Sequence, residues 1–176
     1  MNIQLDPQSK TEKNAVDHFR SDVLNGLQNT PKKLSSKYFY DKIGDHLFQE
    51  IMAMPSYYLT RCELDIFKNK TDELIDLLIP GNEPFDLIEL GAGDAIKSTY
   101  LLEQLTRKGI DFTYMPIDIS GNILSILHKK LSNQLPELKI VCLEGDYFEM
   151  LQKAASLSDR RKVVLFLGSN IGNMTP

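Results

Sequence analysis

The pattern of hydrophobic and polar positions changes near the middle of the chain. Over residues 1–80, apolar side chains recur at steps of three and four residues, which places them on one face of a helix. This spacing predicts three helices, at Thr11–Leu27, Asp41–Met54 and Thr60–Ile79. The turn-forming segment Pro80–Pro84 follows them. We therefore expect a helical N-terminal region that packs alongside the remaining residues as a partial lid.

From residue 81 onward, short apolar runs alternate with segments of helix length. The runs predict strands at Phe85–Leu90, Phe112–Ile117, Leu138–Leu143 and Val163–Leu167. The segments between them predict helices at Ile96–Lys108, Ser120–Leu131 and Tyr147–Ala155. Strands that alternate with helices at this spacing are typical of βαβ units, whose parallel sheet is buried on both faces. The predicted fold of residues 81–176 is therefore α/β, with a parallel, doubly wound sheet.

The last predicted strand is the most apolar one, and only residues 168–176 follow it. A doubly wound sheet that ends on such a strand has an unpaired hydrophobic edge, which promotes aggregation. We therefore expect the sheet to be incomplete at its C-terminal side and the chain to be a fragment of a longer protein. The alternative is that a partner chain covers this edge, and self-association near Leu167 is one form of it.

The composition argues against several classes of function. With 20 Lys and Arg against 24 Asp and Glu, the net charge is −4, and no basic run predicts a nucleic-acid partner. No apolar run approaches the roughly 18–20 residues of a membrane span, and the polar start of the chain does not resemble a secretory signal. Cys62, Cys142 and three scattered histidines lack the spacing of a zinc site or a disulfide framework. These features predict a cytoplasmic protein without a bound metal.

Glycine and aspartate residues follow the predicted strands at one common end. Gly91 and its neighbours allow a tight turn and the close approach of a ligand after the first strand. Asp118 follows the second strand, and its carboxylate can accept hydrogen bonds from both hydroxyls of a ribose. Asp146 and Tyr147 follow the third strand, where an acid and an aromatic ring could meet an adenine. Each position alone is also explained by a turn or a helix cap, but together they indicate an adenosine-containing ligand across the strand ends.

Other segments give weaker signals. Residues 168–173 contain two Gly and two Asn, which could orient a small polar substrate but also form ordinary turns. Ile96 stands where a dinucleotide fingerprint requires a third small residue, and this disfavours a nicotinamide-dependent oxidoreductase. The sequence contains no Ser-His-Asp or Cys-His pattern and no phosphate-binding loop motif. The charged residues within 60–76 fit a solvated helix face better than a site.

Several sequence blocks together resemble a known family of enzymes. Glu89–Gly93 followed by Lys97 resembles the S-adenosylmethionine motif of class I methyltransferases. Four further blocks are similar to those of the histidine-specific N-alpha-methyltransferases of ergothioneine biosynthesis. These blocks are Lys37–Asp41, Pro55–Arg61, Pro116–Ser120 and Phe166–Asn173. The resemblance covers the N-terminal half of such proteins and implies a class I, Rossmann-like methyltransferase fold.

The resemblance also implies which residues bind the cofactor, S-adenosyl-L-methionine, and which line the substrate pocket. The positions that match cofactor contacts are Gly91, Lys97, Asp118, Asp146 and Tyr147. The positions that match the amino-acid pocket are Tyr40, Phe48, Tyr57, Gly168 and Asn173. Leu59 and Asn170 depart from the residues that the family often has, and either could reshape the pocket. In the family, the imidazole ring of the substrate is recognised by residues of a C-terminal region that this chain does not contain. Specificity for histidine is therefore inferred from the resemblance alone.

The activity that the resemblance implies is methyl transfer to the α-amino group of L-histidine, repeated up to three times to give hercynine. Such a transfer is an in-line displacement to which the protein contributes mainly by positioning, so no catalytic side chain is required. Two alternatives stay open at this point. One is a related methyltransferase for another amino acid or an indole-derived amine, and the other is a cofactor-binding fragment without activity.

Overall fold

The computed structural model describes residues 7–39, 41–79, 81, 83–168 and 170–173. Within it the chain divides into two compact units between residues 39 and 40. The boundary that the sequence predicts at residues 80–81 lies inside the second unit, and the domain division it implies stays a prediction.

The first unit contains one long helix and one short one. α1 covers Pro7–Gln28, and the 3-10 helix η1 covers Ser36–Phe39. The Tyr38 hydroxyl donates a hydrogen bond to the Asp22 carboxylate at 2.6 Å, and the Lys37 ammonium pairs with the same carboxylate at 2.6 Å. These two contacts hold η1 against the C-terminal half of α1.

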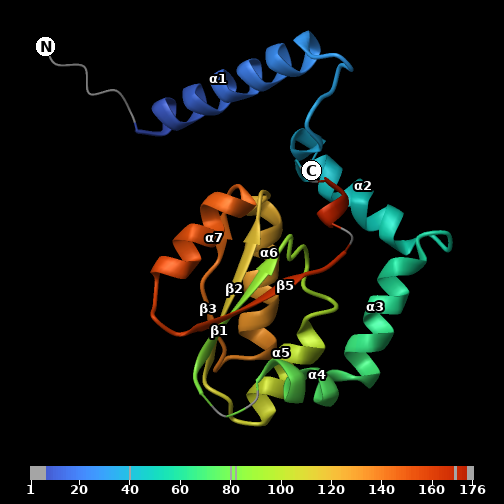
Figure 1. Ribbon diagram of the computed structural model, residues 1–176, viewed down its shortest axis with the longest axis vertical. Helices are drawn as coiled ribbons and strands as arrows, with labels where there is room; N and C mark the ends of the chain where they lie inside the picture. Colours follow the sequence, from blue (N-terminus) through green and yellow to red (C-terminus); the bar gives the residue numbers. More distant parts are fainter. Residues whose placement is uncertain (1–6, 40, 80, 82, 169, 174–176) are drawn as a thin grey trace, which may run out of the picture. The chain divides into compact units, whose positions relative to one another are not determined.

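The second unit is built around a parallel β-sheet (Figure 1). Its strands are β1 (Phe85–Leu90), β2 (Phe112–Asp118), β3 (Lys139–Ile140), β4 (Leu143–Glu144) and β5 (Arg161–Phe166). The order across the sheet is β3-β2-β1-β5, and β4 pairs with the carboxyl end of β2. β1 lies between β2 and β5, and all six of its residues are buried. Each of these pairings is parallel, which confirms the predicted α/β fold.

Helices cover both faces of this sheet. The helices that follow the strands are α5 (Thr99–Arg107), α6 (Gly121–Gln134) and α7 (Tyr147–Ser156). α5 and α6 bury their leucines on the face that carries Leu87, whereas α7 packs Met150 and Ala154 on the face that carries Ile88. A parallel sheet with both faces covered is what the alternation of strands and helices predicts.

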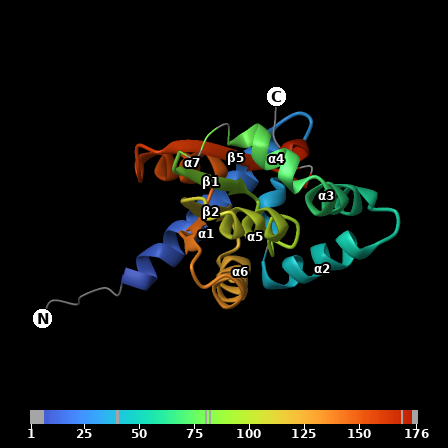
Figure 2. The ribbon, with the colours of Figure 1, turned by 90° about the horizontal axis from the view of Figure 1, so that it is seen from below.

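Three helices precede the sheet in the second unit: α2 (Lys42–Ala53), α3 (Tyr58–Asn69) and α4 (Thr71–Leu78). Figures 1 and 2 show α3 and α4 beside α5. The prediction of a single helix over Thr60–Ile79 is wrong, because the chain leaves the helical conformation at Lys70. The two acidic residues that follow Thr71 explain the new start, since carboxylates favour the positive end of a helix.

Two further elements differ from the prediction. The third predicted strand is split into β3 and β4, and short strands of this kind are common at a sheet edge because they limit pairing with other chains. α5 begins three residues later than predicted, since Gly93 and Ala95 have φ angles of +55° and +53°, outside the helical region. The delayed start leaves a longer loop between β1 and α5.

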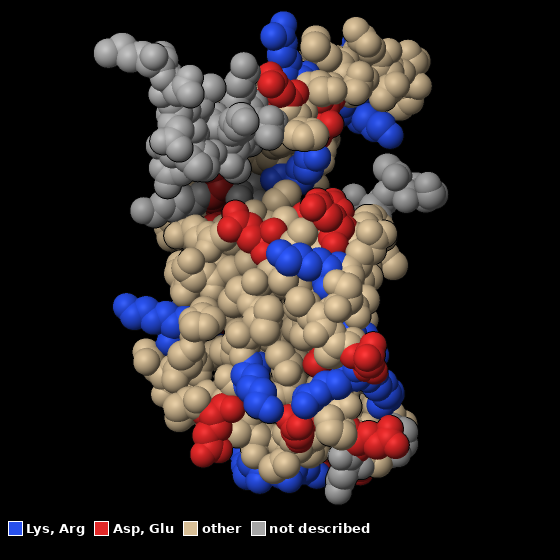
Figure 3. Space-filling model, turned by 90° about the vertical axis from the view of Figure 1, so that its left-hand side faces the viewer, with Lys and Arg blue, Asp and Glu red and all other residues tan. Residues whose placement is uncertain are grey.

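Charged side chains of both signs are interspersed on the face that Figure 3 shows. At the amino end of β2, the Asp111 carboxylate pairs with Lys139 and with Arg160, each at 3.0 Å. Among the helices of the described residues, none has the combined length and apolar character that a membrane crossing requires.

Truncation of Leu127 tests how much the packing of α6 stabilises the fold. Its side chain is 0% exposed, so Leu127→Ala should lower the free energy of unfolding by about 2–5 kcal/mol. Ile126→Ala is the matched control, because Ile126 is the preceding residue of the same helix and is 50% exposed. There we expect a change below about 1 kcal/mol. Urea denaturation followed by circular dichroism measures both, and equal losses would contradict the packing described above.

Candidate active site

The strand order reverses at β1, and this topological switch point lies at the carboxyl end of the strand. The chain passes from β1 to β2 on one side of the sheet and returns to β5 on the other side. In open α/β sheets, ligands bind outside the carboxyl ends of the strands at such a reversal. The loop 91–98 after β1 and residues 167–168 after β5 flank this point, and both contain predicted site residues.

Gly91 is the centre of the contacts at this end of the sheet. It has a φ of +67°, and its N–H donates to the Ile117 carbonyl of β2 at 2.8 Å. A Cβ at this position would meet the Tyr147 hydroxyl at 2.5 Å and the side-chain amide of Asn170. Only glycine therefore fits here, and Gly91, Tyr147 and Asn170 form one packed group.

Asp118 is tied to the same loop. One carboxylate oxygen accepts a hydrogen bond from the Gly93 N–H at 3.1 Å, and the other accepts from the Ser120 N–H at 3.0 Å. Burial raises the pKa of Asp118 above its ordinary value, against the lowering effect of these backbone hydrogen bonds. A carboxylate oxygen has more than one acceptor position, so Asp118 can still receive hydrogen bonds from a ligand.

Asp146 and Tyr147 have different surroundings although they are neighbours in sequence. Asp146 is the N-cap of α7, where its carboxylate accepts from the Phe148 N–H at 2.9 Å. The Tyr147 ring lies edge-on to Phe166 of β5, with centroids 6.4 Å apart, while its hydroxyl lies over Gly91. Tyr147 thus lies with Gly91 at the strand ends. The Asp146 carboxylate instead caps α7.

Lys97 forms an ion pair that the sequence did not predict. Its ammonium lies 2.5 Å from one carboxylate oxygen of Glu63 on α3, and the other oxygen accepts from the Gly168 N–H at 2.8 Å. The Glu63 side chain is 24% exposed, so its assignment to a solvated helix face is wrong. Glu63 lies one helical turn before the buried Phe67, and this spacing is the sequence signal that could have placed it on the inner face.

The predicted amino-acid pocket is described in part. The rings of Phe48 on α2 and Tyr57, the N-cap of α3, are edge-to-face with centroids 6.4 Å apart. Asn173 is the last residue of the 3-10 helix η2 (Asn170–Asn173), and its side chain lies outside the described part. Tyr40 lies outside the described residues altogether. The structure therefore brings Phe48 and Tyr57 together and places Gly168 near Lys97.

A second unpredicted acid connects α2 to the loop after β2. The Asp45 carboxylate accepts a hydrogen bond from the Ser120 hydroxyl at 2.7 Å. The same hydroxyl accepts from the Ile123 N–H at 3.2 Å and caps α6. Because Ser120 also donates its N–H to Asp118, Asp45 connects the helix that carries Phe48 to the carboxyl end of β2, where Asp118 lies.

Glu89 is a buried acid directly beneath the Gly91 turn. Its side chain is 2% exposed and accepts a hydrogen bond from the Tyr114 hydroxyl at 2.5 Å. Burial raises the pKa of Glu89 to about 7, although Tyr114, Ser98 and the nearby Lys97 lower it in part. This carboxyl group therefore changes its charge near neutral pH.

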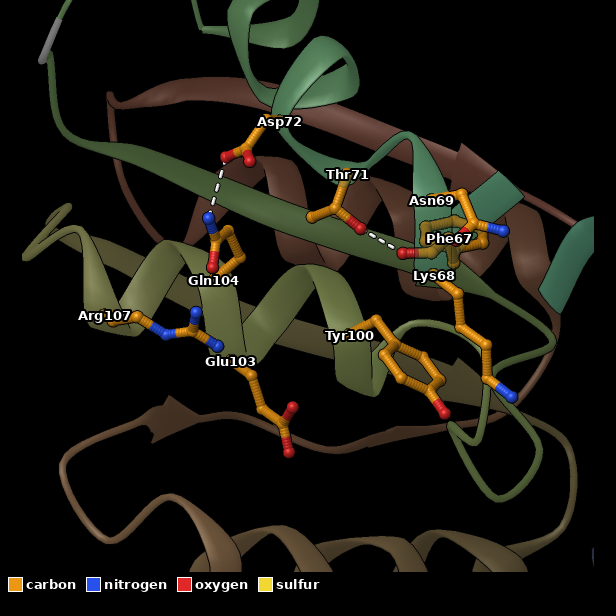
Figure 4. A pocket seen from close by; sticks show the side chains of 9 residues that line it. All are labelled: Phe67, Lys68, Asn69, Thr71, Asp72, Tyr100, Glu103, Gln104 and Arg107. Carbon is orange, nitrogen blue, oxygen red and sulfur yellow. Dashed lines mark hydrogen bonds between the residues drawn. The ribbon is translucent and has the colours of Figure 1, made fainter. Parts of the chain in front are cut away.

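A polar pocket lies elsewhere, between α3, α4 and α5 (Figure 4). It has a volume of about 260 Å³. Figure 4 shows Asp72 and Gln104 joined by a hydrogen bond at its wall, and the donor and acceptor atoms of this bond are 2.7 Å apart. The other lining residues are Phe67, Lys68, Asn69, Thr71, Tyr100, Glu103 and Arg107. This lining includes none of the predicted site residues, so the candidate site is at the strand ends.

Substitution of two glycines separates backbone strain from side-chain contact. Gly91 and Gly93 both have positive φ angles, so replacing either with alanine strains the backbone by about 1–2 kcal/mol. Only at Gly91 would the added methyl group collide with Tyr147 and Asn170, whereas nothing lies within 4 Å at Gly93. We expect Gly91→Ala to lose about 1–3 kcal/mol more unfolding free energy than Gly93→Ala. Urea denaturation measures this difference, and its absence would show that Tyr147 is not held over Gly91.

The raised pKa of Glu89 predicts a dependence of stability on pH. Because the folded pKa is about 7 and the ordinary value is 4.5, the folded chain binds this proton more tightly than the unfolded chain. The resulting stabilisation is complete below about pH 4.5, and about 3 kcal/mol is lost as the pH rises through 7. We expect Glu89→Gln to remove this loss when urea denaturation is compared at pH 5, 6, 7 and 8. The exposed Glu73→Gln should keep the profile of the unmodified chain, and parallel profiles for all three proteins would refute the prediction.

The chain is similar to a family of known enzymes. Residues 19–176 match the sequence model of a family described as histidine-specific, S-adenosylmethionine-dependent methyltransferases. The chain is 35% identical over 157 residues to a histidine N-alpha-methyltransferase of Mycobacterium tuberculosis, which covers 89% of this chain and 47% of that protein. It is 31% identical over 146 residues to ergothioneine biosynthesis protein 1 of Schizosaccharomyces pombe, covering 80% and 19% of the two chains.

A further relative has a different name. The chain is 28% identical over 163 residues to a 4-dimethylallyltryptophan N-methyltransferase of Claviceps fusiformis, covering 90% of this chain and 45% of that protein. The chain therefore spans about half the length, or less, of the curated relatives described here.

Proposed function

The chain belongs to the family of histidine-specific, S-adenosylmethionine-dependent methyltransferases, and on this basis we propose that it methylates the α-amino group of L-histidine. The proposal includes transfer of three methyl groups in succession, which gives hercynine. The observation that supports it best is that Tyr147 lies over Gly91 while Asp118 is bonded to Gly93 in the same turn, at the carboxyl end of β1. Gly91 follows β1, Asp118 ends β2 and Tyr147 begins the helix after β4, and together their chemistry suits an adenosine-containing cofactor.

The residues at the strand ends fit S-adenosylmethionine in their chemistry. Gly93 has open space where a Cβ would be, so the backbone of the turn can be approached closely. The Asp118 carboxylate would hold the two ribose hydroxyls, and Asp146 with Tyr147 would meet the adenine. Gly91 would lie along the cofactor, and the Lys97 ammonium would pair with the carboxylate of its methionine portion.

Positioning is the main contribution that this chain's residues make to the reaction. S-adenosylmethionine supplies a methyl group on a sulfonium, so the protein needs to bring a neutral amine into line with that group. Uncharged residues would hold the carboxylate and amino groups of the substrate without adding net charge. These residues are Tyr40, Tyr57, Gly168 and Asn173. The aromatic faces of Phe48 and Tyr57, which already pack together, would favour the trimethylammonium product as its cationic head grows.

A second candidate substrate is an indole-derived amino acid. The relative from Claviceps fusiformis, whose name specifies 4-dimethylallyltryptophan, supports it, but its 28% identity is lower than the 35% of the histidine enzyme. Histidine is therefore the substrate we propose first. A cytoplasmic location and self-association through the strand edge near Leu167 stay predictions from the sequence.

Mass spectrometry of small-molecule products tests the proposed function. We incubate the chain with S-adenosylmethionine and a panel of amino acids that includes L-histidine and 4-dimethylallyltryptophan. The expected result is histidine with one, two and three added methyl groups and no change in the other amino acids. Methylation of 4-dimethylallyltryptophan alone would favour the second candidate. Absence of any methylated product would contradict the activity proposed for this chain.

Two aspartates at opposite ends of β2 provide a test variant and its control for this assay. Asp118 lies at the carboxyl end of the strand and Asp111 directly precedes its amino end, so the same change to asparagine can be made at both ends. We expect Asp118→Asn to lower the rate of product formation at least about 10-fold, because a charged acceptor for the ribose is lost. Asp111→Asn should leave the rate unchanged, and equal effects of the two changes would refute the role of Asp118.

A further inference from the structure

We propose that Glu63 is a positioning residue that holds Lys97 and Gly168 in place for the cofactor and the amino acid. This inference rests on the proposed function. Glu63 lies on α3, outside the loops that carry the predicted site residues. Its carboxylate nevertheless contacts the loop after β1 and the loop after β5 at the same time.

The two oxygens of the Glu63 carboxylate have separate partners. Oε2 lies 2.5 Å from the Lys97 ammonium, and Oε1 accepts the Gly168 N–H at 2.8 Å. Lys97 matches a cofactor position and Gly168 an amino-acid position, so one side chain joins the two predicted halves of the site. α3 begins directly after Tyr57, and Glu63 therefore also connects the helix that follows this substrate-side residue to the cofactor side.

The ion pair between Glu63 and Lys97 is partly buried, and this strengthens it. The Lys97 and Glu63 side chains are 17% and 24% exposed, so water and salt screen their attraction less than they would on an open surface. A lysine side chain is long and loses rotamer freedom when it is fixed. Glu63 fixes Lys97 when the chain folds, before any ligand arrives. The rotamer entropy of Lys97 is therefore lost on folding and does not weaken cofactor binding.

Pairing with Glu63 leaves Lys97 able to bind a second group. An ammonium has three N–H donors, and Glu63 accepts one of them, so two stay available for the carboxylate of the cofactor. The Gly168 contact also ties the backbone directly after β5 to α3, next to Leu167, whose carbonyl accepts a hydrogen bond from the Asn170 side-chain amide at 2.9 Å. Glu63 therefore contacts the loop after β1 through Lys97 and the residues after β5 through Gly168.

A competing role for Glu63 predicts the opposite result. If its carboxylate occupied the place of the cofactor carboxylate, removal of its charge would tighten cofactor binding. The contact with Gly168 favours positioning, because a competitor for Lys97 would have no need of a second partner in another loop. The sign of the change in affinity separates the two roles.

Isothermal titration of the chain with S-adenosylhomocysteine, the cofactor product, tests the proposal. We expect Glu63→Gln to weaken binding about 10-fold, because the charge that orders Lys97 is lost. Glu73→Gln is the matched control: Glu73 forms an ion pair with Lys70 at 2.6 Å, but its side chain is 67% exposed. There we expect a change of less than about 2-fold.

A double-mutant cycle shows whether Glu63 acts through Lys97. Lys97→Gln should weaken binding on its own, and addition of Glu63→Gln to it should change the affinity by less than about 2-fold further. Glu63→Asp, which keeps the charge, should recover part of the affinity and serves as the test variant if Glu63→Gln does not fold. Thermal unfolding without ligand is measured for every variant, so that loss of the fold is not mistaken for loss of the contact.

Several outcomes would overturn the inference while the proposed function stands. One is tighter or unchanged binding by Glu63→Gln, and another is an equal loss from Glu63→Gln with and without Lys97. Failure of the unmodified chain to bind S-adenosylhomocysteine would be different, because it would overturn the proposed function and with it the inference.

Discussion

The register of β1 with its two neighbours decides where the site can form. Leu90 is level with Ile117 of β2 on one side and with Phe166 of β5 on the other. β1 and β5 therefore end at the same level and β2 ends one residue later, so the segments that follow them lie at one edge of the sheet. The hydrogen bond from Gly93 to Asp118 depends on this alignment. A slip of one residue would turn each side chain of the slipped strand to the opposite face of the sheet and separate these groups.

Acidic groups gather around this end of the sheet. Glu89 and Asp118 are held by adjacent strands, burial raises the pKa of both, and the charge of Asp118 raises that of Glu89 further. Glu63 adds a third carboxylate beside Lys97. Two acids that are costly to ionise alone become easier to ionise when a cation approaches. A ligand such as S-adenosylmethionine, which carries a sulfonium and an ammonium against one carboxylate, suits this environment.

The sequence predicted those parts of the site that local pattern determines. Gly91 and Asp118 follow strands, and the alternation of strands and helices was sufficient to place them at a common edge. Glu63 and Asp45 were missed because their partners lie on other elements and no local rule links them. The break at Lys70 was missed for another reason, since the apolar face continues through it while the backbone does not. Helical periodicity predicts which side of a helix is buried, but it does not predict a break at which the helix axis changes direction.

The contacts that define the site join residues far apart along the chain. Gly93 and Asp118 are separated by 25 positions, Asp45 and Ser120 by 75, and Glu63 and Gly168 by 105. Closure of long loops costs more entropy than closure of short ones, so each of these contacts requires distant parts of the chain to be held together by the rest of the fold. A partly folded chain therefore has no site, and a ligand can stabilise only the complete unit. In a cell, the supply of such a ligand would influence how much of the protein survives proteolysis as well as how fast it works.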